Sequence, residues 1–339
     1  MGTPRANDGL SRGRVILMPY LDRPSFFLND ARLLAERHTV VDSPCRSQGE
    51  ILRTTALVGR ADLVFCWFAS VRFLPVVLAA RLLGRKVVIV SGGYDVASLP
   101  AIGYGNMAQP LTRLLGRLVL RSAHAVAAFS VSGLEEAALH GRVPRAKLRH
   151  IPLGYDVERQ FPPPLPGPRE RLVLSVGYAS LSSIHRKGLL TVARLSHLLP
   201  DVRFVIAGPA EPAALEHLRE ASGPNVGFPG RVSDADLRHL YSTAAVYLQP
   251  SLHEGFGSAV AEAMLYGCIP VVSRRFSLPE VVGESGLYAD PEDLEDIARQ
   301  VSRVLEGAVT LATAPRERIA QEFPLARRRL ELLGLIDAL

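Results

Sequence analysis

The segment Phe161-Pro-Pro-Pro-Leu-Pro-Gly-Pro168 divides the sequence into two halves. Five prolines in its last seven residues fix φ and remove backbone N–H donors, so neither a helix nor a central strand can run through it. On each side, short apolar runs alternate with longer amphipathic segments. We therefore predict domains at 1–160 and 170–312, a proline-rich linker at 161–169, and a C-terminal helix at 313–339, for which one arrangement is packing back toward the first domain.

The alternation defines a fold class. Strand-like runs lie at 14–18, 63–67, 86–90 and 125–129, and then at 172–176, 203–207, 245–248 and 269–272. Helix-like segments lie at 26–37, 48–59, 74–83, 111–122 and 133–140, and then at 187–199, 212–221, 234–243, 258–266 and 291–305. Because such alternation builds parallel sheets covered on both faces, we predict an α/β fold of two doubly wound, Rossmann-like domains facing across a cleft. Ligands bind beyond the carboxyl ends of the strands, so the cleft is the expected site.

The composition fits a globular protein. The chain has 339 residues, 48% apolar and 21% charged, which suits two domains of ordinary length. Its three cysteines lie far apart, which argues against a disulfide framework or a cysteine zinc site and favours a reducing compartment. The polar first dozen residues suggest no secretory signal, and the most apolar window, 63–80, is broken by Arg72 and Pro75. We predict a cytoplasmic protein.

Positive charge is concentrated in the first half. The net charge of +6 divides into +9 over residues 1–160, from 21 basic and 12 acidic side chains, and −3 over residues 161–339, from 18 and 21. This asymmetry suggests an anionic partner, such as a phospholipid headgroup, a lipid-linked phosphate or nucleic acid. A merely arginine-rich composition explains it equally well.

Three arginines in the predicted helix at 111–122 bear on whether the first half of the chain binds an anionic partner. Arg113, Arg117 and Arg121 recur every four residues and form one stripe. A basic amphipathic helix could rest on an anionic membrane surface, which would place the protein peripherally on the inner face of a membrane. A solvated stripe above an ordinary buried face is the simpler interpretation, and we favour it. We predict no nucleic-acid partner, since no interleaved aromatic residues accompany the charge.

The segment Ser251-Leu-His-Glu-Gly-Phe-Gly-Ser-Ala-Val-Ala-Glu-Ala-Met264 carries the strongest chemical signal. Gly255 and Gly257 let backbone N–H groups come close to a ligand, and the helix N-terminus at Ser258 favours a negative group such as a phosphate. Glu262 interrupts an otherwise apolar helix, and a buried carboxylate needs donors, for which ribose hydroxyls are one candidate. A carboxylate that merely points to water is the alternative.

Two glutamates separated by seven residues, Glu254 and Glu262, give this segment a resemblance to the retaining GT-B glycosyltransferases of family 4. The similarity covers most of residues 170–305. The resemblance implies that Glu254 contacts hydroxyls of the donor sugar and that Glu262 binds the ribose. It also implies that the amides of Phe256 and Gly257 bind the sugar and the phosphates.

A pair of cations, Arg186 and Lys187, precedes Gly188 at a predicted helix start. Two positive charges at a helix N-terminus could hold a diphosphate and stabilise the charge that develops as one departs. Family members place an arginine and a lysine here, many with the arginine directly after the glycine of the preceding strand, where this chain has Tyr178. The resemblance implies catalytic roles for Lys187 and Arg186, with Tyr178 beside the donor. A solvated pair at a helix start is the alternative.

The stretch Phe228-Pro-Gly-Arg-Val232 precedes a helix that Ser233 should cap. In the resembled family this loop borders the nucleobase, which makes Arg231 and Val232 candidate donor contacts. Asp234-Ala-Asp236 also forms a DxD string, which metal-dependent glycosyltransferases of another fold use to hold Mn²⁺ or Mg²⁺. We reject that interpretation and predict no metal site, because acids in the first turn of a capped helix need no metal to explain them.

The first half departs from the family pattern. Segment 18–27 lacks the Gly-Gly loop that many members use to admit the donor phosphate, and Gly92 and Gly93 stand where a histidine is often found. Asp95 could position an acceptor hydroxyl or could simply stabilise a turn. These departures concern acceptor chemistry rather than donor binding.

Together these features predict a retaining, metal-independent transfer of a sugar from a nucleoside diphosphate sugar to an acceptor hydroxyl, lipid-linked or on a glycan. The donor is a co-substrate, and we predict no cofactor. A sugar-nucleotide epimerase of the same architecture, or a sugar-nucleotide-binding protein without catalysis, would also fit.

Overall fold

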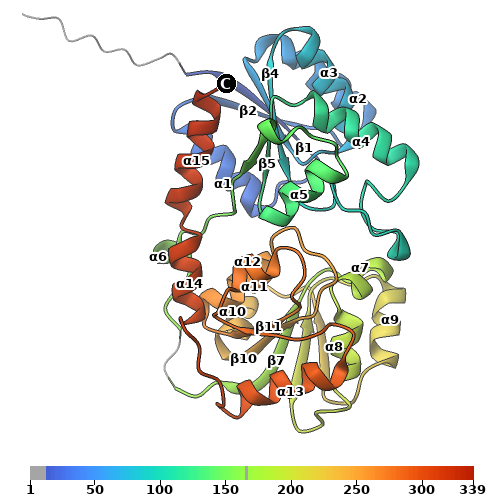
Figure 1. The fold of residues 1–339 in the computed structure, drawn as a ribbon, viewed down its shortest axis with the longest axis vertical. Coiled ribbons are helices and arrows are strands. Elements are labelled where there is room, and N and C mark those ends of the chain that lie inside the picture. The colour runs from blue at the N-terminus through green and yellow to red at the C-terminus, as the bar shows by residue number, and fades with distance from the viewer. Residues whose placement is uncertain (1–12, 165–166) are drawn as a thin grey trace, which may run out of the picture.

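The computed structural model describes residues 13–164 and 167–339, which form two α/β domains stacked end to end (Figure 1). The strands are β1 (Val15–Tyr20), β2 (Thr39–Pro44), β3 (Leu63–Trp67), β4 (Lys86–Ser91), β5 (Ala125–Ala128), β6 (Leu148–His150), β7 (Glu170–Val176), β8 (Arg203–Ala207), β9 (Val226–Gly230), β10 (Ala244–Gln249), β11 (Ile269–Val272) and β12 (Leu287–Tyr288). The α-helices are α1 (Ser25–Ala35), α2 (Gln48–Leu57), α3 (Leu74–Leu82), α4 (Pro110–Ser122), α5 (Val131–Leu139), α6 (Val157–Gln160), α7 (Leu181–Arg186), α8 (Leu189–Leu195), α9 (Pro212–Glu220), α10 (Asp234–Thr243), α11 (Ser258–Leu265), α12 (Leu278–Val282), α13 (Leu294–Leu305), α14 (Pro315–Glu322) and α15 (Leu325–Asp337). Within the described ranges, none of these helices has both the length and the apolar character that crossing a bilayer requires.

Each domain is built on a parallel sheet of six strands, ordered β2-β1-β3-β4-β5-β6 in the first domain and β12-β11-β10-β7-β8-β9 in the second. All five residues of β3 are buried, as expected for a parallel strand with helices on both faces of its sheet. The strand order reverses between β1 and β3 in the first sheet, and between β7 and β10 in the second. The prediction of two doubly wound α/β domains is confirmed.

Four strands were not predicted, and all four lie at sheet edges. They are β2, β6, β9 and β12, the outermost strands of the two sheets. An edge strand is covered less completely, so its sequence carries more polar residues, glycine or proline than a central strand does. The sequences Leu148-Arg-His150 and Val226-Gly-Phe-Pro-Gly230 show this weaker apolar signal.

The predicted helix at 187–199 corresponds to α8, which begins at Leu189 and ends at Leu195. A further short helix, α7, precedes α8 and was not predicted, and the two helices are separated at Gly188, which has φ of +71°. Ser180 begins α7 with a capping box, in which its hydroxyl accepts from the Ser183 amide. Arg186 and Lys187 therefore end α7, and Lys187 directly precedes Gly188, the N-cap of α8, so the pair also lies at the predicted helix start.

The chain crosses between the domains twice, and the two crossings lie side by side. The Tyr155 amide donates to the Phe323 carbonyl at 2.9 Å, and the Tyr155 carbonyl accepts from the Leu325 amide at 2.9 Å. Residues 313–339 contain two helices where one was predicted. Figure 1 shows α14 against the second domain and α15 against the first, where α15 contacts α1.

A buried ion pair joins α15 to the first domain. The Arg328 guanidinium donates to both carboxylate oxygens of Asp30, from Nε at 2.7 Å and from Nη2 at 2.6 Å. Trp67 Nε1 donates to the same carboxylate at 3.0 Å, and Arg328 Nη1 donates to the carbonyls of Ile151 and Pro152. Every polar end of this pair thus has a partner, as a buried charge requires.

Candidate active site

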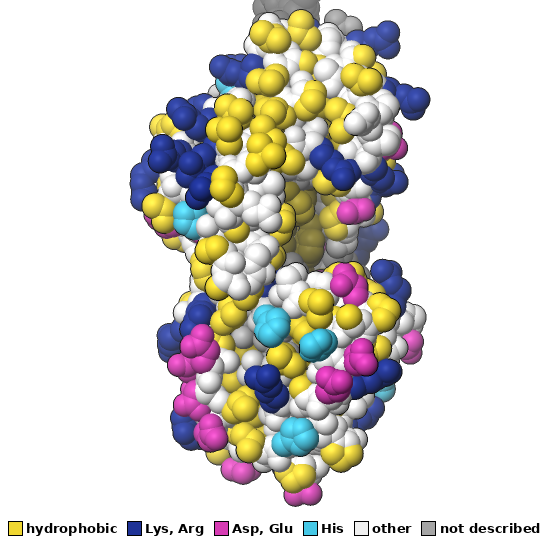
Figure 2. Space-filling model, turned by 90° about the vertical axis from the view of Figure 1, so that its right-hand side faces the viewer, with side chains coloured by type: hydrophobic (Ala, Val, Ile, Leu, Met, Phe, Trp, Pro, Cys, Tyr) yellow, Lys and Arg dark blue, Asp and Glu magenta, His cyan; other side chains and the backbone are white. Residues whose placement is uncertain are grey.

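A cavity of about 420 Å³ lies between the domains, at the carboxyl ends of β7 and β10, where the strand order of the second sheet reverses. A hollow between the two domains is visible in Figure 2. We call this space the donor cavity. The second domain lines it with Val176, Gly177, Tyr178, Lys187, Gln249, Glu254, Gly255, Phe256, Gly257, Ser258 and Ala259. The first domain lines it with Pro24, Phe26, Trp67, Phe68, Gly92, Phe129 and Leu153.

The loop after β10 brings the glycine motif against the first domain. A Cβ atom at Gly255 would overlap the carbonyl oxygen of Gly92. Gly257 has φ of +95°, a conformation that side chains of L-residues rarely adopt. Ser130 of the first domain donates its hydroxyl to the Gly255 carbonyl at 3.0 Å. A close approach therefore requires glycine at 255, and the turn into α11 requires it at 257.

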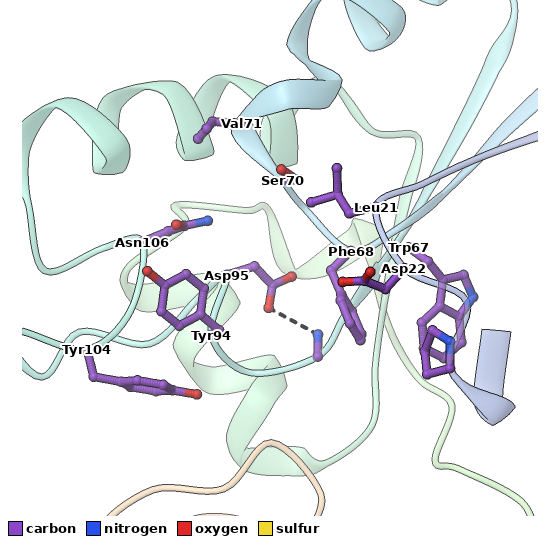
Figure 3. A pocket seen from close by; sticks show the side chains of 12 residues that line it. Leu21, Asp22, Trp67, Phe68, Ser70, Val71, Tyr94, Asp95, Tyr104 and Asn106 are labelled. Carbon is purple, nitrogen blue, oxygen red and sulfur yellow. Dashed lines mark hydrogen bonds between the residues drawn. The ribbon is translucent and has the colours of Figure 1, made fainter. Parts of the chain in front are cut away.

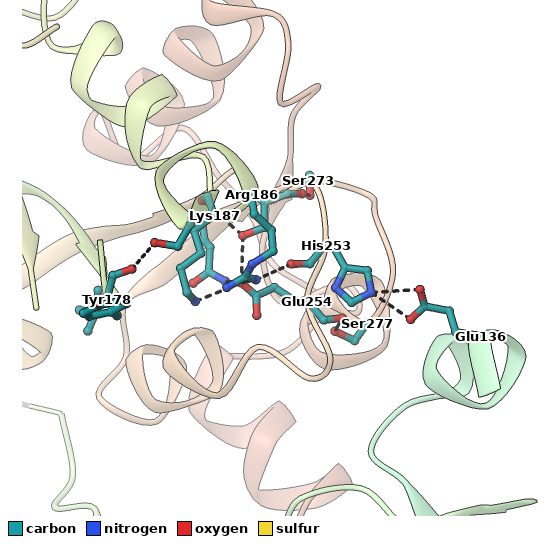
Figure 4. A network of polar contacts seen from close by, with 12 residues as sticks. Glu136, Tyr178, Arg186, Lys187, His253, Glu254, Ser273 and Ser277 are labelled. Atoms are coloured by element: carbon teal, nitrogen blue, oxygen red, sulfur yellow. Dashed lines mark hydrogen bonds and ion pairs between the residues drawn. The ribbon is translucent and has the colours of Figure 1, made fainter. Parts of the chain in front are cut away.

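The structure brings the Glu254 carboxylate together with both predicted cations (Figure 4). Its Oε1 lies 3.2 Å from Lys187 Nζ and 3.3 Å from Arg186 Nη1. The same oxygen accepts from Gln249 Nε2 at 3.0 Å and from Ser251 Oγ at 3.2 Å. Burial opposes ionisation of Glu254, but the two cations and these donors hold its pKa below the usual value. The carboxylate is therefore ionised at neutral pH.

The two cations have different surroundings. Lys187 lines the donor cavity, whereas Arg186 is buried behind it, with 9% of its surface exposed. The Arg186 guanidinium stacks on the Tyr104 ring, 4.6 Å from its centre, and donates to the His253 carbonyl at 2.8 Å. Lys187 can reach a ligand in the donor cavity, while Arg186 supports the loop and adds its charge from behind.

Glu262 lies on α11, one turn beyond Ser258, and is not among the residues that line the donor cavity. Burial raises the pKa of Glu262 to about 7. A hydrogen bond from the Tyr241 hydroxyl, at 3.4 Å, acts in the opposite direction and lowers this pKa. A ligand that donates hydroxyl groups to this carboxylate would favour its ionised form. The Phe256 ring packs against Phe323, with the ring centres 5.2 Å apart, which anchors the turn at the domain junction.

The remaining donor candidates do not gather at one point. Tyr178 is half exposed, lines the donor cavity and donates its hydroxyl to Glu211 at 2.7 Å. Arg231 lines a separate hollow of about 310 Å³, which also includes Gly177 at the end of β7. Val232 lines neither space and belongs to another hollow beside Phe228. Arg231 is thus next to the donor cavity, and Val232 is away from it.

Asp95 is buried and engaged by the backbone. One carboxylate oxygen accepts from the amides of Gly92 and Gly93 at 3.0 and 2.9 Å, and the other accepts from Ala69 at 3.2 Å. Burial raises the pKa of Asp95, and these amides oppose the shift. Its contacts are those of a turn-stabilising residue, although it also lines a second cavity described below.

The pair formed by His253 and Glu136 was missed by sequence reasoning. His253, fully buried, places Nε2 at 2.9 and 3.1 Å from the two carboxylate oxygens of Glu136 on α5 (Figure 4). His253 directly precedes Glu254, so the first domain reaches the motif loop through this contact. The histidine stands within the quoted motif, but nothing in the sequence indicates a partner 117 positions away.

The DxD string behaves as a helix start. Ser233 accepts a hydrogen bond from the Asp236 amide at 3.1 Å, which confirms the predicted cap of α10. In the part of the chain that the structure describes, no three His, Cys, Asp or Glu side chains gather as a metal site would require.

Comparison with solved structures shows the class of fold. HepE of Anabaena, in a complex with UDP and glucose, aligns with a TM-score of 0.77 at 16% identity, over 96% of this chain and all of that one. Sucrose-phosphate synthase of Thermosynechococcus elongatus aligns with a TM-score of 0.74 at 19% identity, over 96% and 98% of the two chains. The fold is the two-domain, Rossmann-like GT-B fold, as predicted.

Sequence comparison adds a family match in the second half. Residues 156–322, just under half of the chain, match the model of the glycosyl transferases group 1. O-antigen chain mannosyltransferase B of Escherichia coli is 43% identical over 81 residues, 24% of this chain and 21% of that protein. A GDP-mannose-dependent alpha-(1-6)-phosphatidylinositol dimannoside mannosyltransferase of Mycobacterium tuberculosis is 30% identical over 174 residues, 51% of this chain and 45% of that protein. The chain thus spans less than half of either relative. These matches support a GT-B glycosyltransferase.

Proposed function

We propose that this protein transfers a sugar from a nucleoside diphosphate sugar to an acceptor hydroxyl, with retention at the anomeric carbon and without a metal ion. The observation that carries the proposal is the Glu254 carboxylate, held by Lys187 at the wall of the donor cavity. The glycine turn at the start of α11 lies in the same wall. The family match over residues 156–322 supports the same reaction, and the motif resemblance supports assignment to family 4.

Each residue has a role in this proposal. Backbone N–H groups at the start of α11 and the Lys187 ammonium bind the diphosphate, and the lysine with Arg186 behind it offsets the charge of the leaving group. Glu254 orients the hydroxyls of the donor sugar, and Glu262 accepts from the ribose. With two cations in these positions, the leaving group needs no metal ion.

The reaction is a single exchange at the anomeric carbon. The acceptor oxygen approaches from the face that the leaving diphosphate occupies, and its bond to the carbon forms as the carbon–phosphate-oxygen bond breaks. The bonding electron pair departs with the diphosphate, whose oxygen takes the proton of the acceptor hydroxyl. No other reactant is needed.

GDP-mannose is the donor we propose to test first. Several relatives are named as mannosyltransferases, and one is named as GDP-mannose-dependent. UDP-sugars are the matched comparison, because HepE was solved with UDP.

We also propose that the first domain approaches an anionic membrane surface from the cytoplasmic side through α4. On this helix Leu111, Leu114 and Leu118 are 67%, 58% and 47% exposed, beside the arginine stripe that includes Arg117 and Arg121. Figure 2 shows hydrophobic side chains gathered between Lys and Arg on the upper domain, and more Asp and Glu on the lower. Exposed leucines beside arginines favour insertion at a lipid surface over a solvated stripe.

The membrane proposal has its own test. Wild-type protein should pellet with phosphatidylglycerol vesicles at low salt and not with phosphatidylcholine vesicles. Replacement of the three leucines by glutamine should weaken this binding and leave transfer to a soluble acceptor unchanged. Equal pelleting of wild type with both lipids would contradict the proposal.

A donor panel tests the proposed activity. GDP, UDP and ADP and their sugars are added to the wild-type protein and its melting temperature is followed, since a ligand that binds only the native state raises it. The stabilising sugar nucleotide is then incubated with and without acceptors and followed by NMR. New glycoside with retained configuration supports the proposal. Epimerised donor without acceptor, stabilisation without any turnover, or no stabilisation by any nucleotide would each overturn it.

A further inference from the structure

A second cavity, of about 490 Å³, lies in the first domain beside the donor cavity (Figure 3). It lies at the carboxyl ends of β1, β3 and β4, where the strand order of the first sheet reverses. The two cavities share Pro24, Trp67, Phe68 and Gly92 as walls. A molecule held in the second cavity would therefore adjoin the sugar of a bound donor.

Aromatic rings form two sides of this second cavity. Tyr94 and Tyr104 pack edge to face with ring centres 5.1 Å apart, and Trp67 and Phe68 lie 5.0 Å apart. In Figure 3 the two tyrosines lie on one side and Trp67 and Phe68 on the other. The electron-rich faces of such rings accept the C–H groups on one face of a sugar ring.

Polar side chains between the rings have unused hydrogen-bonding capacity. The Asp22 carboxylate, the Asn106 side-chain amide and the Tyr94 hydroxyl line the cavity. Within residues 13–164 and 167–339, none of the three is hydrogen-bonded to another protein group. Together they offer acceptors and donors, which is what the hydroxyl groups of a sugar require.

The charge of the second cavity differs from that of the donor cavity. Among the described residues that line it, Asp22 and Asp95 are acidic and none is a lysine or an arginine. The donor cavity, by contrast, has the Lys187 ammonium in its wall. A phosphate in the second cavity would meet the Asp22 carboxylate, and no lysine or arginine among the lining residues would offset it, so the lining favours an uncharged ligand.

We infer that the second cavity is an acceptor subsite for an uncharged sugar residue. The part of the acceptor that occupies this cavity is therefore the end of a glycan, and not a lipid-linked phosphate or a sugar phosphate. This inference rests on the proposed transferase function. The acceptor ring stacks on Tyr94, Asp22 and Asn106 bind its hydroxyls, and one hydroxyl faces the donor past Phe68. A lipid portion, if the glycan carries one, lies outside this cavity.

Variants at Tyr94 provide the first test, because its side chain is 52% exposed and its removal should not disturb folding. Loss of the ring in Tyr94→Ala should raise KM for a neutral acceptor about tenfold, the effect of losing one aromatic contact. Tyr94→Phe, which keeps the ring, should stay within about threefold of wild type. Donor affinity and donor hydrolysis by water should be unchanged in both variants.

An acceptor panel completes the test. Methyl glycosides of mannose, glucose and galactose are compared with the corresponding 6-phosphates and with farnesyl phosphate, in wild type and in Asp22→Lys. The inference is supported if wild type prefers a methyl glycoside to the corresponding 6-phosphate and if this preference is smaller or reversed in Asp22→Lys. Preference for a phosphorylated acceptor by wild type, or equal KM in Tyr94→Ala and wild type, overturns it.

Different results would overturn the proposed function and the subsite assignment. If no sugar nucleotide is bound or hydrolysed by wild type, the proposed function is wrong. If a sugar nucleotide is hydrolysed normally while the acceptor results go against the second cavity, only the subsite assignment is wrong.

Discussion

Two carboxylates, the buried Asp30 in the first domain and the partly buried Glu254 in the second, are paired with cations in different ways. Asp30 shares its two oxygens among three donors, two from Arg328 and one from Trp67. Glu254 receives four contacts on Oε1 alone, and among the described residues its Oε2 has no hydrogen-bond partner.

The difference separates a structural role from a binding role. A carboxylate with both oxygens satisfied has nothing left to offer a ligand, and its partners fix the position of α15. Glu254 keeps one oxygen unused beside the donor cavity, next to a lysine that has further N–H groups to donate. Removal of one partner should therefore reduce stability at Asp30 and reduce catalysis at Glu254.

The largest effect is expected at the ion pair between Asp30 and Arg328, in which both carboxylate oxygens accept hydrogen bonds. Arg328→Ala leaves the Asp30 carboxylate buried and unpaired, which should lower the free energy of unfolding by about 3–5 kcal/mol. Denaturant titration measures this. Arg329→Ala removes the neighbouring, exposed pair with Glu36 and is the matched control, expected to cost at most about 1 kcal/mol. Similar losses in the two variants would contradict the distinction.

The second effect is expected in catalysis. Lys187→Ala removes the positive charge that offsets the negative charge of the leaving group, and should lower the transfer rate by roughly 10²–10³-fold. The free energy of unfolding should change by no more than about 1 kcal/mol. Single-turnover rates and melting temperatures measure the two quantities. His185→Ala, on the exposed side of α7, should retain the wild-type rate. A wild-type rate in Lys187→Ala would refute its role.

A smaller effect is expected where the first domain touches the motif loop. Glu136→Gln weakens the contact with His253, and a loosened loop should reduce kcat/KM about tenfold. Glu135→Gln is the control, because Glu135 is exposed and, among the residues that the structure describes, forms an ion pair with Arg145 alone. If the two variants behave alike in steady-state kinetics, His253 does not position Glu254 through this contact.

The smallest effect is a change with pH. The pKa of Glu262 is raised to about 7, so the free protein protonates this group as pH falls below 7. Ribose hydroxyls would favour the ionised carboxylate, so donor affinity should rise as pH increases through about 7 and then level off. Calorimetric titration should show this slope in wild type and a flat profile in Glu262→Gln. Equal slopes would show that Glu262 does not bind the donor.

Sequence reasoning predicted the central strands well and missed the sheet edges. β3, β8 and β11 match their predicted bounds, because buried parallel strands are apolar along most of their length. The four edge strands have mixed sequences, which pairing with a neighbouring strand stabilises more than burial does. Pairing between distant segments leaves no local pattern in a sequence.

Site residues that lie close together in the sequence could be predicted, whereas contacts between residues of the two domains could not. The loop of residues 251–258 could be read directly, because the glycines and Glu254 are close in sequence. The contact of Arg186 with Tyr104, and of His253 with Glu136, depends on how two domains meet. Helix α7 was also missed, and so was the close approach of Gly188 to Pro250, a residue that is distant in sequence.

The paired crossings at Tyr155 and Phe323–Leu325 restrict how the domains can move. A single connecting strand would let one domain swivel freely over the other. Two strands bonded to each other resist twisting and sliding, because either motion would break both hydrogen bonds. Bending about an axis through the two crossings would leave both hydrogen bonds intact, so these bonds permit a change in the width of the cleft while they oppose rotation of one domain over the other.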